Sequence, residues 1–135
     1  MKVADLAFMG HKDLQESVVA TMVGLGVNAD APSLIHWDGD EPTIYVADDG
    51  GIWKLERKET SRRMFAVDGK LIPWDQARGA GLGFSSFVDA PGPGTVMFRM
   101  DHPEIHESAT HDEAAQKALT DFGQHCVRQR ARFPR

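Results

Sequence analysis

The chain has 135 residues, a net charge of −5, and 41% hydrophobic against 26% charged side chains. This balance excludes a disordered chain, and the length predicts a single domain spanning residues 1–135. The lone Cys126 excludes an internal disulfide and favours a reducing compartment, so we expect the cytoplasm. The longest apolar run, 18–27, is about half of the ~20 residues that a membrane helix needs, so no membrane association is predicted.

Charge is distributed unevenly along the chain. Residues 1–60 hold five basic and eleven acidic side chains, whereas 127–135 hold four arginines and no acid. The sequence therefore predicts an acidic body with a basic C-terminal arm over 127–135. Such a body repels polyanions, so we do not expect general binding of nucleic acid. Only the basic hairpin around Arg62 and Arg63 and the C-terminal arginines offer a local contact to phosphate.

The first predicted element is a helix over 13–27. Leu14, Val18, Met22 and Leu25 recur at helical spacing and define one apolar face. Glycines at 24 and 26 then weaken the helix, and the turn-forming run 28–33 follows.

Short strands with turn residues between them are predicted from 33 to 100. The expected strands are 33–37, 43–48, 52–58, 64–67, 70–72 and 95–100, with a further possible one at 85–88. Asp68-Gly69 tolerates the positive φ angles of a tight turn, so we expect a hairpin between 64–67 and 70–72. In the last strand, Val96, Phe98 and Met100 share one face.

A second helix is predicted to begin at His111. Thr110 and Glu113 have the spacing of a capping box, and an apolar stripe follows. The stripe consists of Ala115, Ala118, Leu119, Phe122 and Cys126. The expected fold is α+β, with an antiparallel sheet of five or six strands and both helices on one face, as a two-layer sandwich.

Residues 73–94 are rich in glycine and proline and are predicted to form a lid or a partner-contacting loop. The candidate partner-binding residues here and in the basic hairpin are Trp74, Arg78, Phe84, Phe87, Arg62 and Arg63. Trp74 would anchor either this loop or a partner, and we favour the loop. The run Gly79–Gly83 lacks the last glycine and the following helix of a nucleotide-binding loop.

Three histidines fall within 101–113. His102, His106 and His111 suit zinc as ligands, but their spacing lacks the glutamate of the H-E-x-x-H motif. We therefore favour a polar connection and keep a small metal-dependent hydrolase, built on these histidines, as the alternative.

Other catalytic patterns fail. His125 and Cys126 are adjacent on the predicted helix and point about 100° apart, and Cys126 lies on its buried stripe. The acidic runs near 38–41 and 48–49 do not match a calcium loop. We therefore expect a non-enzymatic binding module without a cofactor. It would bind another protein, as an inhibitor, an immunity-type protein or an accessory protein does.

Overall fold

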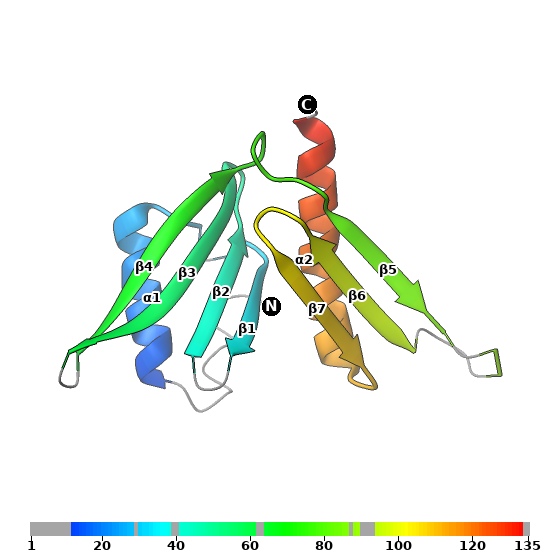
Figure 1. Ribbon diagram of the computed structural model, residues 1–135, viewed down its shortest axis with the longest axis horizontal. Coiled ribbons are helices and arrows are strands. Elements are labelled where there is room, and N and C mark those ends of the chain that lie inside the picture. Colours follow the sequence, from blue (N-terminus) through cyan, green and yellow to red (C-terminus); the bar gives the residue numbers. More distant parts are fainter. Residues whose placement is uncertain are drawn as a thin grey trace. The chain divides into compact units, whose positions relative to one another are not determined.

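The computed structural model describes residues 12–28, 30–38, 41–61, 64–86, 88–89 and 94–133 (Figure 1). The chain divides into two compact units, Met1–Ile72 and Pro73–Arg135, and the described residues of each form one helix and one antiparallel sheet. The α+β class is therefore confirmed. The expected single sheet covered by both helices is wrong, because four strands form one sheet and three strands form another.

The helix of the first unit is α1, Lys12–Leu25. It matches the predicted helix closely, and Val18 and Met22 of its apolar face are buried. Gly26 ends it with φ 76°, a left-handed conformation that glycine adopts without strain. The next residue, Val27, is buried and donates its N–H to the carbonyl of Met22 at 2.9 Å.

The first sheet has the order β1-β2-β3-β4. Its strands are β1 (Ser33–Asp38), β2 (Glu41–Ala47), β3 (Gly51–Ser61) and β4 (Met64–Pro73). Ile44, Val46 and Leu55 of this sheet form a core with Val18 and Met22 of α1. Trp53, which lies within the predicted strand 52–58, is partly buried against that core.

The predicted hairpin at Asp68-Gly69 is wrong, because both residues lie inside the continuous strand β4. Gly69 serves close packing instead of a turn. A β-carbon there would lie 3.0 Å from Leu55 Cδ2 and would clash with Leu25 Cδ1. A glycine inside a strand often marks such a close approach, and the local sequence does not distinguish it from a turn glycine.

The second unit contains β5 (Gly81–Ser85), β6 (Thr95–Met100), β7 (Ile105–Thr110) and α2 (Glu113–Arg132). The strands form a sheet in that order, with α2 against one face of it and β5 at an edge (Figure 1). Val96, Phe98 and Met100 are buried, so their predicted common face is confirmed. Phe98 packs edge to face on Phe122 of α2, with ring centroids 5.4 Å apart.

The start of α2 differs from the predicted capping box. The N-cap is Asp112, whose Oδ1 accepts the N–H of Ala115 at 3.1 Å. Thr110 ends β7, and its hydroxyl lies 2.9 Å from that of Thr95, its cross-strand partner. His111 then turns the chain with φ 60°. Strand pairing therefore uses Thr110, and the helix begins two residues later than expected.

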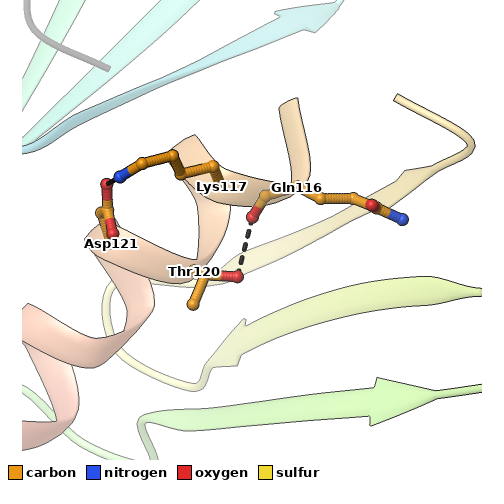
Figure 2. Close-up of polar contacts among 4 residues, drawn as sticks. All are labelled: Gln116, Lys117, Thr120 and Asp121. Carbon is orange, nitrogen blue, oxygen red and sulfur yellow. Dashed lines mark hydrogen bonds and ion pairs between the residues drawn. The ribbon is translucent and has the colours of Figure 1, made fainter. Parts of the chain in front are cut away.

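Helix α2 packs through the predicted stripe at Leu119, Phe122 and Cys126, which are buried, although Ala115 is exposed. Its outer surface carries an ion pair between Lys117 and Asp121 at 2.8 Å, and the Thr120 hydroxyl donates to the Gln116 carbonyl (Figure 2). Helix α2 extends to Arg132, so Arg128, Arg130 and Arg132 of the predicted basic arm lie within this helix. Within the described residues, no helix is both long enough and apolar enough to span a membrane.

Candidate functional site

Trp74 is buried inside the second unit. Its side chain is 1% exposed, and its ring lies 6.3 Å from that of His125. Its carbonyl accepts a hydrogen bond from Arg130 Nη1 at 3.1 Å. This burial fits the favoured role of Trp74 as an anchor of the loop, and its candidate role in partner binding stays a prediction.

The other candidate contact residues differ in their exposure and in whether the structure describes them. Arg78 is exposed, and its backbone bridges the chain to His102, to whose carbonyl it donates at 2.9 Å. Phe84 lies in β5 and is 56% exposed. Arg62, Arg63 and Phe87 lie outside the described residues.

The three histidines of 101–113 lie on different structural features. His102 pairs with Arg78 in an isolated bridge, His106 lies within β7, and His111 turns the chain into α2. All three are exposed. Residues 105–110 form a strand, so the expected polar connection is wrong for that part. Across the described ranges, no three His, Cys, Asp or Glu side chains are grouped to hold a metal ion.

Cys126 is fully buried in α2. Burial raises the pKa of its thiol, because the apolar surroundings disfavour the charged thiolate. The thiol therefore stays protonated at neutral pH, and it lacks the character of a nucleophile.

A hollow in the described structure lies on the three-stranded sheet. It has a volume of about 610 Å³ and is lined entirely by residues of β5, β6 and β7. Side chains of a strand alternate between its two faces, and Phe98 faces α2, so Met97 and Arg99 face the opposite side. This second face, which we call the open face, carries exposed Met97, Arg99, His106 and Ser108.

Two glycines create the hollow. The register places Gly81 beside Arg99 and Gly83 beside Met97. Nothing lies within 4 Å of a β-carbon built at Gly81, and only Met97 Cε, at 3.8 Å, is that close at Gly83. Because the two glycines have no side chains, nothing projects from this face of the sheet at their positions in β5. Met97, which is 48% exposed, provides an apolar surface beside them.

Arg99 and Glu107 are the charged residues that line the hollow. Arg99 is paired with His106 in the register of β6 and β7. Arg99 also contacts Asp101, at 3.5 Å, but both side chains are well exposed, and such ion pairs contribute only about 0–1 kcal/mol. The guanidinium of Arg99 therefore stays accessible to another carboxylate.

Local sequence patterns did not predict this face. The further possible strand is predicted at 85–88, whereas β5 spans Gly81–Ser85. The usable signal was the alternation of Gly81, Leu82, Gly83 and Phe84, which has the period of two expected for a strand. The glycines concealed that signal because they are poor strand formers.

No protein-family model matches this sequence, and no match was found to a curated protein or to a solved structure.

Proposed function

We propose that this protein is a cytoplasmic, non-enzymatic binding module that recognises another protein, as inhibitors, immunity-type proteins and accessory proteins do. The single observation that carries the proposal is the hollow of about 610 Å³ on the open face, next to the edge strand β5. Sheet edges and their adjoining grooves are a recurrent means by which domains bind segments of other proteins.

A protein partner fits this surface better than a small substrate does. Small-molecule sites enclose most of their ligand, whereas this hollow is open and has an exposed methionine as its floor. Methionine adapts its shape readily, which suits a protein-contacting surface. Strong electrostatic catalysis also depends on charges held away from water, and Arg99 and Asp101 are both exposed.

A partner of this surface is identified by photo-crosslinking inside the native cell. A photoreactive amino acid is introduced at Met97 in one variant and, as controls, at Val23 of α1 or Lys117 of α2, which are also exposed. We expect one crosslinked protein at position 97 that is absent at both controls and is displaced by excess unmodified chain. The same products at all three positions, or no product at 97, would overturn the proposal.

A further inference from the structure

This inference rests on the proposed function and specifies what occupies the open face. Four strands stand at the ends of the two sheets in the described chain, namely β1, β4, β5 and β7. Three of them carry acidic residues, which are Asp38 in β1, Asp68 in β4 and Glu107 in β7. The fourth, β5, has the sequence GLGFS and carries no charge.

Charged side chains on an edge strand oppose the addition of another strand. The edge of β5 lacks that protection, and no described strand pairs with its outer side. Alternate backbone groups of such an edge point away from the sheet and can bond an extended peptide. Among the four edges, β5 is therefore the one best suited to accept a strand.

The register defines what the side chains of an added strand would meet on the open face. They would continue three cross-strand rows, because paired strands align their side chains across the sheet. The rows are Gly81–Arg99–His106, Gly83–Met97–Ser108 and Ser85–Thr95–Thr110. The first is cationic, the second has an apolar centre, and the third carries hydroxyl groups.

Glycine makes the first two rows accessible from the edge. A strand beside β5 lies about 10 Å from β6, which is two strand spacings. Over Gly81 no β-carbon stands between the added strand and Arg99, so a glutamate or aspartate can approach the guanidinium. Over Gly83 an apolar side chain can contact Met97 in the same way. Glu107 belongs to the alternate set with buried Ile105 and Ala109, on the face toward α2.

We propose that the occupant is an extended acidic peptide segment of the partner protein, added as a fourth strand to the edge of β5. Its residues facing the open side would be, in order, an acidic one beside Gly81, an apolar one beside Gly83 and a small or hydroxyl one beside Ser85. Arg99 provides the charge complementarity, because a guanidinium can donate two parallel hydrogen bonds to a carboxylate and repels an ammonium group.

The proposal is tested on the full chain with labelled eight-residue peptides whose alternate positions are Glu, Leu and Thr. In the comparison peptide, Lys replaces Glu. We expect the Glu peptide to bind at least tenfold more tightly at low salt, and the preference to decline as salt rises. Arg99→Gln should abolish the preference, whereas Arg128→Gln, a matched change of an exposed arginine on α2, should leave it intact. Equal binding of both peptides would overturn the acidic specificity.

The hollow and the strand pairing are tested separately. Gly83→Val fills the hollow with a good strand former, so peptide affinity should fall at least tenfold while the melting temperature does not fall. Gly50→Val, at an open position of the other unit, should leave affinity unchanged. Two further peptides are N-methylated at alternate residues, one at the odd positions and the other at the even positions. Only one of the two should bind, because only alternate N–H groups of an added strand face β5. Binding of both methylated peptides would overturn strand addition.

Failure of this inference differs from failure of the proposed function. If Met97 crosslinks to a cellular protein but neither peptide binds, the function stands and the acidic-strand inference is overturned. If a single-stranded oligonucleotide displaces the Glu peptide, or if the chain dimerises through β5 and Gly83→Val disrupts the dimer, the occupant is not a peptide of a partner and the inference is likewise overturned.

Discussion

Gly123 of α2 lies directly against Phe98 of β6. A β-carbon at position 123 would be 3.0 Å from Phe98 Cδ2 and 2.8 Å from Leu82 Cδ1, both closer than ordinary packing allows. We therefore expect Gly123→Ala to destabilise the protein by about 1–3 kcal/mol, although alanine is the better helix former. Urea unfolding followed by circular dichroism measures the change.

Gly24 of α1 provides the matched control, because a β-carbon there has no neighbour within 4 Å. Gly24→Ala should stabilise the protein by up to about 1 kcal/mol, through helix propensity alone. Equal effects of the two substitutions would show that Gly123 does not set the distance between α2 and its sheet.

Phe122 fills the interface between α2 and the three-stranded sheet, where it is fully buried against Phe98. Phe122→Ala should lower the free energy of unfolding by about 3–5 kcal/mol, because it removes a buried ring and leaves a cavity. Hydrogen exchange of the β6 amides reports this loss within the second unit. Phe84→Ala is the comparison, and its effect should be smaller because Phe84 is 56% exposed.

Asp112 and Thr110 allow the two possible helix caps to be compared. Asp112→Ala should cost about 1 kcal/mol, because the first turn of α2 loses the acceptor for the Ala115 N–H. Thr110→Ala removes only an exposed hydroxyl contact with Thr95 and should cost about 0.2–1 kcal/mol. Thermal unfolding measures the loss of stability in both variants. A larger loss for Thr110→Ala than for Asp112→Ala would contradict the structure.

Cys126 links stability to pH through its buried thiol. Burial in the folded state raises the pKa of this thiol, whereas in the unfolded chain its pKa is about 8.5. The contribution of this thiol to the free energy of unfolding is therefore complete below about pH 8.5. It decreases as pH rises above that value, by about 1.4 kcal/mol per pH unit. Urea titrations between about pH 8 and 10 should show this extra slope in the native sequence.

Cys126→Ala should abolish the extra slope while leaving the slopes from other groups in place. In parallel, iodoacetamide should alkylate the native protein slowly and the urea-unfolded protein rapidly, because only the thiolate reacts. Fast alkylation of the folded chain would contradict the burial of this side chain.

Local patterns predicted several elements well. The apolar spacing of Val18 and Met22 defines α1, and the alternation of Val96, Phe98 and Met100 defines the buried face of β6. Each of these signals is repeated within a few residues, so neighbouring residues alone suffice to detect it.

Glycines led to the same error at two places in the chain. Gly69 suggested a turn but lies inside β4, and Gly81 and Gly83 suggested a loop but lie inside β5. A glycine in a strand and a glycine in a turn differ in what packs beside them, and that neighbour is distant in sequence. At Gly69 it is Leu55, and at Gly83 it is Met97.

The sequence by itself determined the α+β class, the two helices, most strands and the buried stripe of α2, because backbone periodicity and side-chain polarity are encoded locally. Only the tertiary structure decided that the strands form two sheets, that Thr110 joins a strand, and that Gly81, Gly83, Met97 and Arg99 share one face. Strand order and register depend on pairing between residues far apart in the chain, which no local pattern specifies.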